Sequence, residues 1–313
     1  MKLEGIHHIT AITGDAQRNV DFYAGLLGLR LVKKTVNQDE PSVYHLFYAD
    51  EHGSPGADLT FFEFRGAPRG RPGAGMVHRI VWRVGSPAAL DFWAERLGDA
   101  GHGVERPTGG DAPRLRFADP EGLEHELVVA SVPDQPLIAD HPEVPAEVAL
   151  QGFHAARAFA RDPQRSRHLL EDALGFEPRD SAWEARGTER GGLWAYDEAP
   201  EAPGLQGAGT VHHIAWASLM DEHERWRERA IEGGARPTPV IDRFWFRSVY
   251  FREPSGVLFE IATIGPGFAV DEDPEHLGEK LVLPPFLEDR REQIEAVLTP
   301  IVNPRGAGRA AAR

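Results

Sequence analysis

The sequence predicts an α+β fold built from four copies of a unit in which a strand and a helix are followed by several strands. An internal repeat supports this prediction: Val77–Trp82 aligns with Val211–Trp216, and Asp119–Glu126 aligns with Glu253–Glu260. The 313 residues also suit about two domains. Because one such unit cannot bury its sheet alone, the units are expected to pair, so that two cupped sheets face each other around a cavity.

Composition and charge exclude several classes of protein. The chain is 41% hydrophobic and 27% charged, and no apolar run approaches the roughly 18 residues of a membrane span. It contains no cysteine, which excludes disulfides and thiolate metal sites. A net charge of −15 argues against nucleic-acid binding. The N-terminus begins a strand and shows no signal peptide, so we expect a cytoplasmic protein. The sequence leaves open whether the chain forms a homo-oligomer.

The first unit shows the repeated order of elements. A strand from Ile6 to Ile12 precedes Asp15, a residue type that favours a helix N-cap. Apolar residues at helical spacing predict a helix over Ala16–Leu27, and Gly28 is typical of the position after a helix. Strands are expected near residues 29–36, 43–48 and 59–64.

The other units follow the same order. Their helices are expected near residues 87–100, 163–174 and 222–232. We divide the chain into an N-terminal pair of units (1–130), a linker rich in Pro, Asp and Glu (131–149), a C-terminal pair of units (150–264) and a tail (265–313). In the tail, the acidic run Asp271–Glu275 is expected to form a solvated turn, and Pro285–Leu298 an amphipathic helix.

Two pairs of adjacent histidines open the first and fourth units, His7-His8 and His212-His213. Side chains alternate across a strand, so the two members of a pair are expected to point to opposite faces. Large apolar residues share a face with His212, whereas Ala215 and a second alanine share a face with His213. We therefore expect His213 to face the cavity, and His212 to be a packing residue or to lie behind a ligand.

The last strand of the fourth unit carries one carboxylate within an apolar run. Phe259 and Ile261 would occupy its packed face, which leaves Glu260 for the cavity. The N-terminal pair shares the His-His-Ile pattern of the fourth unit. We therefore expect the second histidine of this pair, His8, to face the cavity as His213 does.

Two neutral imidazoles and one carboxylate that leave open positions are the ligand set of non-haem Fe(II) oxygenases. Mn(II) is an alternative, and Zn(II) and Ni(II) sites use similar ligands. At the position of His213, unit 2 carries Arg79 and unit 3 carries Ala155. At the position of Glu260, unit 2 keeps a carboxylate, Glu126, whereas unit 1 carries Thr60. Only the first and fourth units complete a triad, which predicts that units 1 and 4 pair and that units 2 and 3 pair.

At these residues the chain resembles the vicinal oxygen chelate superfamily, which includes glyoxalase, bleomycin-resistance proteins and extradiol dioxygenases. It is most similar to ring-cleaving dioxygenases that open hydroquinone and chlorohydroquinone. The motifs that carry the resemblance are His7-His8-Ile9-Thr10 with Gly14-Asp15-Ala16-Gln17, Tyr44-His45-Leu46 with Ala49-Asp50-Glu51, Gly152-Phe153-His154, His212-His213, and Tyr250 through Glu260.

The resemblance implies a fold of paired βαβββ modules and an Fe(II) ion bound by His8, His213 and Glu260. It also implies roles near the metal for His7, Tyr250 and Arg243. The implied reaction is the extradiol-type opening of a hydroquinone-like diol by O2. Tyr250 or His7 would transfer protons, and Arg243 would stabilise the anionic substrate.

Two other functions stay open at this point: a metal-dependent lyase or isomerase of the glyoxalase kind, and a small-molecule-binding resistance protein without enzymatic activity. Several further residues receive structural interpretations. We expect Trp216, Trp245 and Phe246 to belong to the core, and His45, His78 and His125 to be structural or to lie at the rim.

Overall fold

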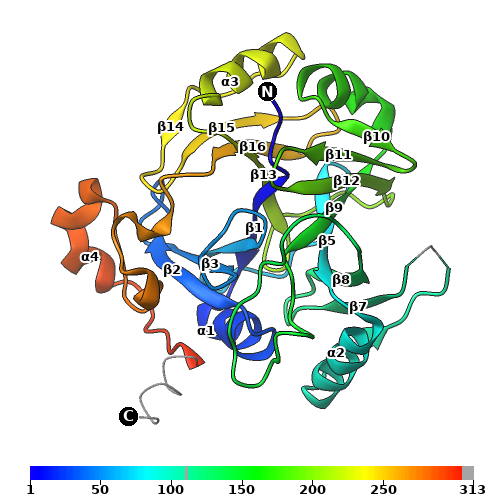
Figure 1. Cartoon of the computed structure of the whole chain (residues 1–313). Coiled ribbons are helices and arrows are strands. Elements are labelled where there is room, and N and C mark those ends of the chain that lie inside the picture. The colour runs from blue at the N-terminus through cyan, green and yellow to red at the C-terminus, as the bar shows by residue number, and fades with distance from the viewer. Residues whose placement is uncertain (110–111, 305–313) are drawn as a thin grey trace.

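The computed structural model describes residues 1–109 and 112–304, and within them the strands form two eight-stranded sheets (Figure 1). The first sheet has, in spatial order, β14 (Ile241–Asp242), β15 (Arg247–Arg252), β16 (Leu258–Thr263), β13 (Val211–Ser218), β1 (Ile6–Thr13), β4 (Asp58–Glu63), β3 (Tyr44–Ala49) and β2 (Arg30–Val36). The second has β10 (Glu177–Arg179), β11 (Ala182–Arg186), β12 (Gly191–Glu198), β9 (Phe153–Ala160), β5 (Met76–Val84), β8 (Glu124–Val129), β7 (Arg114–Ala118) and β6 (Val104–Glu105).

The order of strands confirms the predicted fold class and the predicted pairing of units. The first sheet joins strands of units 1 and 4, and the second joins strands of units 2 and 3. At the centre of the first sheet, β1 runs antiparallel to β13, and each pairs on its other side with a parallel strand of its own unit. The same arrangement recurs around β5 and β9 in the second sheet.

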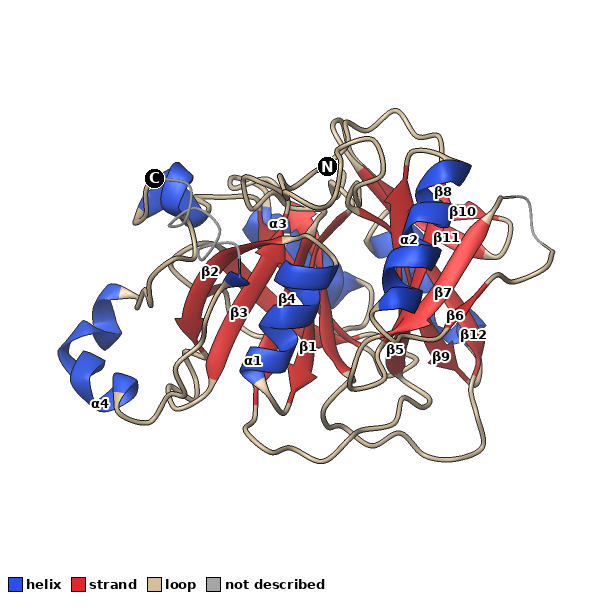
Figure 2. Ribbon diagram, turned by 90° about the horizontal axis from the view of Figure 1, so that it is seen from below, coloured by secondary structure: helices blue, strands red, loops and turns tan. Residues whose placement is uncertain are grey.

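Helices form close to the predicted positions. They are α1 (Ala16–Val20), which continues into a π-helical turn (Asp21–Leu26), α2 (Pro87–Asp99), a 3-10 turn and a π-helical turn (Pro163–Ser166, His168–Ala173), and α3 (His223–Glu232). Asp15 caps α1 by accepting a hydrogen bond from the backbone N–H of Arg18 at 3.1 Å. Tyr23 of the following turn packs against Tyr48 and Phe61 of the first sheet. Figure 2 shows α1 lying against the strands of this sheet.

The two sheets share a hydrophobic core. Trp194 of the second sheet lies edge to face against Trp216 and Phe259 of the first, with ring centroids 6.1 and 5.0 Å apart. Trp216 is therefore a core residue, as predicted, and Phe259 lies on the packed face of β16. Because the apolar faces of β13 and β16 turn toward the second sheet, their opposite faces are left for the cavity.

The tail wraps around the outer strands of the first unit. A 3-10 turn (Pro285–Arg290) and α4 (Arg291–Glu295) occupy the region predicted to be helical (Figure 1). They bury Leu287 and Ile294 against Val36. Within residues 1–109 and 112–304, no helix combines the length and apolarity that a membrane span requires.

The prediction of a solvated turn at Asp271–Glu275 is wrong for its first two residues. Asp271 and Glu272 both form ion pairs with Lys33, whose side chain is fully buried. The Lys33 ammonium also donates to the backbone carbonyl of Phe268, at 3.1 Å. A buried ammonium requires such partners. Asp271 and Glu272 therefore attach the tail to Lys33 of β2, and we call these three residues the clasp.

Candidate metal centre

Two β-bulges lie where β1 pairs with β13. Ile6 pairs with Trp216 but His8 pairs with Ala215, so His7 is an extra residue in β1. In the same way, the register skips His212 in β13. A bulge interrupts the alternation of side chains. As a result, the predicted opposite orientation of each pair is wrong: the Nδ1 atoms are 2.9 Å apart in His7-His8 and 2.8 Å apart in His212-His213.

The three predicted ligands meet around a small residue. Ala215 is the register partner of His8 on one side and of Glu260 on the other, and His213 lies two residues before it on the same strand. His8 Nε2 lies 3.3 Å from His213 Nε2, and Glu260 Oε2 lies 3.2 Å from the first nitrogen and 3.0 Å from the second. All three side chains are buried.

The donor atoms fit a bound cation. Atoms that bind an ion at about 2.1 Å and at right angles to each other would be about 3 Å apart, as these are. Neither carboxylate oxygen of Glu260 has a hydrogen-bond partner among the described residues, although both Nε2 atoms are near. A fully buried carboxylate without a partner implies an absent ion or water, and the close imidazole nitrogens favour an ion.

Burial favours the neutral form of His213, and the neighbouring imidazoles favour the ionised form of Glu260. Burial lowers the pKa of His213, against the attraction of Glu260. Burial, together with repulsion from the neighbouring ligand, also lowers the pKa of His7 to about 3 and that of His212 to about 4. Burial alone would raise the pKa of Glu260, but His8 and His213 hold it well below its usual value. Neutral imidazoles and an ionised carboxylate are the ligating forms.

His7, predicted as a catalytic residue, lies behind His8. Its Nε2 is 3.0 Å from the backbone carbonyl of Thr263, which only accepts hydrogen bonds, so this nitrogen carries the proton. His7 Nδ1 must then accept from His8 Nδ1–H, which leaves the lone pair of His8 Nε2 pointing toward Glu260. The chain of contacts therefore orients the imidazole of His8.

A pocket opens beside the triad, and both Tyr250 and Arg243 line it, as do His8 and His213. Trp245 and Phe246, predicted as core residues, are buried and also line this pocket. His45, predicted to be structural or at the rim, is half-buried, and it also lines the pocket. The remaining described lining residues are Asn37, Gln38, Asp39, Phe47 and Phe62.

Tyr250 and Arg243 form one unit in the pocket. Tyr250 pairs in register with Glu260, and the Arg243 guanidinium lies 5.8 Å from the centre of the Tyr250 ring. Arg243 also forms a two-pronged ion pair with Asp39, at 3.1 and 2.8 Å. Burial, and then Glu260, raises the pKa of Tyr250, so the phenol keeps its proton and is a hydrogen-bond donor at neutral pH.

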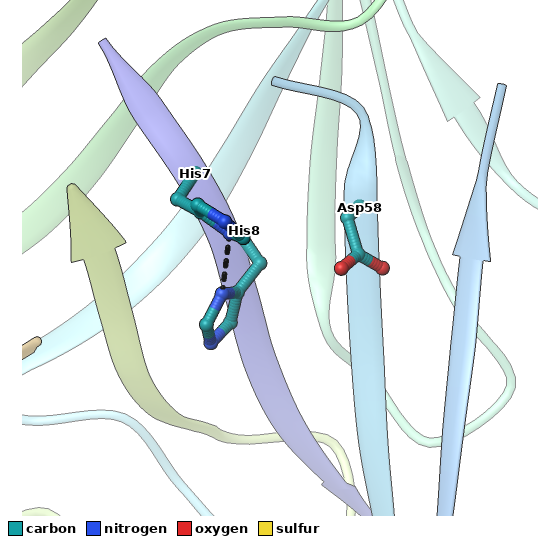
Figure 3. Close-up of side chains that lie close together, drawn as sticks. All are labelled: His7, His8 and Asp58. Carbon is teal, nitrogen blue, oxygen red and sulfur yellow. Dashed lines mark hydrogen bonds between the residues drawn. The ribbon is translucent and has the colours of Figure 1, made fainter. Parts of the chain in front are cut away.

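One further buried carboxylate was missed by the sequence analysis. Asp58 on β4 is the register partner of His8, and its carboxylate lies close to the imidazoles of His7 and His8 (Figure 3). Its side chain is 1% exposed, and neither oxygen has a partner among the described residues. Burial, and then Asp50 and Glu260, raises its pKa well above the usual value. An acidic residue within the apolar strand Asp58–Glu63 was the available signal.

We expect Asp58→Asn to stabilise the metal-free protein at pH 8. Because the pKa of Asp58 is higher in the folded state, folding takes up a proton, and its contribution to stability falls as pH rises from the ordinary carboxyl range toward the folded pKa. Asparagine removes this penalty, worth about 1–3 kcal/mol for a buried group without a partner. Urea unfolding between pH 5 and pH 8 measures the difference.

Asp119→Asn is the matched control for this prediction. Asp119 is also buried, but it accepts hydrogen bonds from the backbone N–H groups of Glu121 and Leu123, at 2.9 and 2.8 Å. Its replacement is expected to destabilise the protein. A metal-free Asp58→Asn protein that is less stable than the wild type at pH 8 would contradict the prediction.

Comparison with known proteins shows the family to which the chain belongs. Residues 5–127 and 152–261 match the Glyoxalase/Bleomycin resistance protein/Dioxygenase superfamily. The chlorohydroquinone/hydroquinone 1,2-dioxygenase of Sphingobium indicum is 34% identical, over 94% of this chain and 95% of that protein. MhqO of Bacillus subtilis (strain 168), provisionally named a ring-cleaving dioxygenase, is 41% identical over 96% of this chain and 97% of its own length.

Solved structures extend the comparison. The crystal structure of a provisionally named dioxygenase from Bacillus subtilis subsp. subtilis str. 168 has a TM-score of 0.90 and 40% identity, and it covers 96% of this chain and 98% of that one. Glyoxalase I from Zea mays shares the fold, with a TM-score of 0.58 at 16% identity over 83% of this chain and 92% of that one. The family match spans most of the chain, and the chain therefore belongs to the Glyoxalase/Bleomycin resistance protein/Dioxygenase superfamily.

Proposed function

We propose that this protein is an Fe(II)-dependent, extradiol-type ring-cleaving dioxygenase that inserts O2 into a hydroquinone-like aromatic diol. The observation that carries the proposal is the convergence of His8, His213 and Glu260 beside a pocket with aromatic walls. Two imidazoles and one carboxylate leave coordination positions free for a diol and for O2. Mn(II) is the alternative metal.

The relatives support the choice of reaction and substrate class. The 34% identical relative from Sphingobium indicum is named for hydroquinone and chlorohydroquinone, and it aligns over nearly the whole of both chains. Relatives from Bacillus subtilis are named as ring-cleaving dioxygenases. The pocket suits such a substrate, because Phe47, Phe62 and Phe246 offer faces and edges to an aromatic ring.

In this proposal the chain's own residues bind, orient and protonate the reactants. Fe(II), held by His8, His213 and Glu260, would supply Lewis acidity and a path for electrons from the diol to O2. Arg243 would attract the anionic form of the diol into the pocket and offset its charge. Tyr250, which stays protonated, would donate a hydrogen bond or a proton to an oxygen atom that becomes negative. His7 would keep His8 in the tautomer that binds the metal.

Oxygen consumption tests the proposal. We expect protein loaded with Fe(II) under anaerobic conditions to take up O2 with hydroquinone or methylhydroquinone, and to convert the diol to a ring-opened acid. Catechol is the comparison substrate, and metal-free protein is the blank. Metal-dependent turnover of a hemithioacetal without O2 would favour a glyoxalase-type lyase instead, and binding of diols without metal or turnover would favour a resistance protein.

A further inference from the structure

We propose that His45 is a substrate-binding residue whose Nδ1 accepts a hydrogen bond from the hydroxyl of the diol that stays protonated and off the metal. This inference rests on the proposed function, since it assigns a contact to the substrate of that same site. Three observations support it: the direction of the hydrogen bonds in the pocket wall, the surroundings of the His45 ring, and the engagement of the carboxylates at the pocket.

A chain of three side chains fixes the tautomer of His45. The Thr60 hydroxyl donates its only proton to Thr10 Oγ1, at 2.8 Å. The same hydroxyl lies 2.9 Å from His45 Nε2, and toward this nitrogen it can now act only as an acceptor. His45 Nε2 therefore carries the ring proton, and Nδ1 is left with its lone pair. No hydrogen-bond partner for Nδ1 is found among the described residues.

The His45 ring is rigidly held and stays neutral. Phe47 and Phe62 lie against it, with centroids 4.0 and 4.3 Å from its own. Burial, and then the nearby His8, His213 and Arg243, lowers the pKa of His45 well below its usual value. A neutral ring with a fixed tautomer is a hydrogen-bond acceptor whose direction is set before the substrate arrives.

The carboxylates at the pocket are already engaged. That of Asp39 is bound to Arg243, and that of Glu260 belongs to the proposed metal centre. Arg243 is a donor, and the protonated Tyr250 has a proton to donate. The aromatic wall thus presents His45 Nδ1 as an acceptor for an O–H group. A substrate bound to the metal through one oxygen can donate a hydrogen bond to His45 Nδ1 only if its ring carries a second hydroxyl. The pocket should therefore bind diols more tightly than phenols with a single hydroxyl.

The experiment compares hydroquinone with 4-fluorophenol, which has fluorine of similar size in place of one hydroxyl but no proton to donate. Dissociation constants are measured anaerobically on the metal-loaded wild type and on His45→Phe, which removes the acceptor. We expect the wild type to prefer hydroquinone, and His45→Phe to lose about 10- to 100-fold in hydroquinone affinity. Affinity for 4-fluorophenol should be unchanged, so the preference should disappear.

Two further variants serve as controls for the loss of the acceptor and for misfolding. His45→Asn keeps an acceptor oxygen near the position of Nδ1, and it is expected to restore part of the preference. His45→Leu removes the acceptor should the phenylalanine ring prevent folding. Metal content is measured in every variant and is expected to equal that of the wild type, because His45 is not a ligand.

The outcomes separate this inference from the proposed function. A metal-loaded His45→Phe or His45→Leu protein that still prefers hydroquinone as the wild type does would overturn the role of His45, whatever the oxygen consumption. A wild type that shows no preference between the two ligands would overturn it as well. A wild type that shows the preference, loses it in His45→Phe, and yet consumes no O2 with any diol would contradict the dioxygenase proposal and leave the role of His45 supported.

Discussion

Replacing Glu260 with alanine is expected to reduce metal affinity by more than the 10- to 100-fold that loss of an outer hydrogen-bond partner typically costs. Glu260 is the one anionic member of the triad, and its oxygen lies 3.0 and 3.2 Å from the two imidazole nitrogens. Without Glu260, the ion would be bound only by two neutral imidazoles, and no carboxylate would offset its positive charge. Oxygen consumption should fall to the level of the metal-free protein, and metal content after dialysis against a chelator should fall in parallel.

The second sheet offers a matched control. Glu126 aligns with Glu260 in the repeat, but arginines surround it: Arg116 forms an ion pair with it at 2.5 Å, and Arg114 and Arg79 approach at 3.5 and 3.8 Å. Glu126→Gln is therefore expected to leave both metal content and oxygen consumption close to the wild type. Equal metal loss in the two variants, or retained metal in Glu260→Ala, would remove the triad from the mechanism.

The pairing of units could be predicted because the four repeated units differ in which metal-ligand residues they carry. Four similar units differ at the ligand positions: Arg79 and Ala155 replace the histidine in units 2 and 3, and Thr60 replaces the glutamate in unit 1. That comparison needs no three-dimensional information. It predicted which ends of the chain meet, and the order of strands in the sheets confirmed it. The roles of the ligands and of Tyr250, Arg243 and His7 stay predictions.

The bulges could not be predicted, because each depends on the register between two strands about 200 residues apart. Strict alternation would separate His7 from His8, whereas the observed register places their nitrogens in contact. That His45 lines the pocket could not be predicted for a related reason. Tyr44, Leu46 and Tyr48 on one face of β3 and Phe47 on the other are all apolar, so the pattern does not tell which face meets the cavity.

Replacing Lys33 with methionine is expected to lower the free energy of unfolding by about 3–5 kcal/mol, the typical cost of removing one partner of a buried ion pair. The Lys33 side chain is fully buried, and Asp271 and Glu272 are largely shielded, so solvent screens these charges little. Asp271 also accepts from the Trp245 indole N–H at 3.0 Å, and Trp245 lines the pocket. Loss of the ammonium should therefore disturb substrate affinity as well as stability.

Lys34→Met is the control for this prediction, because Lys34 lies beside Lys33 but donates only to the backbone carbonyl of Glu279 among the described contacts. Urea unfolding of the two variants isolates the effect of the clasp from that of losing one positive charge. We expect Lys34→Met to remain within about 1 kcal/mol of the wild type, because Lys34 is only half-buried and has no ion pair among the described residues. Similar stabilities of the two variants would show that Asp271 and Glu272 are satisfied without Lys33, and that the tail is held by its apolar contacts with Val36 instead.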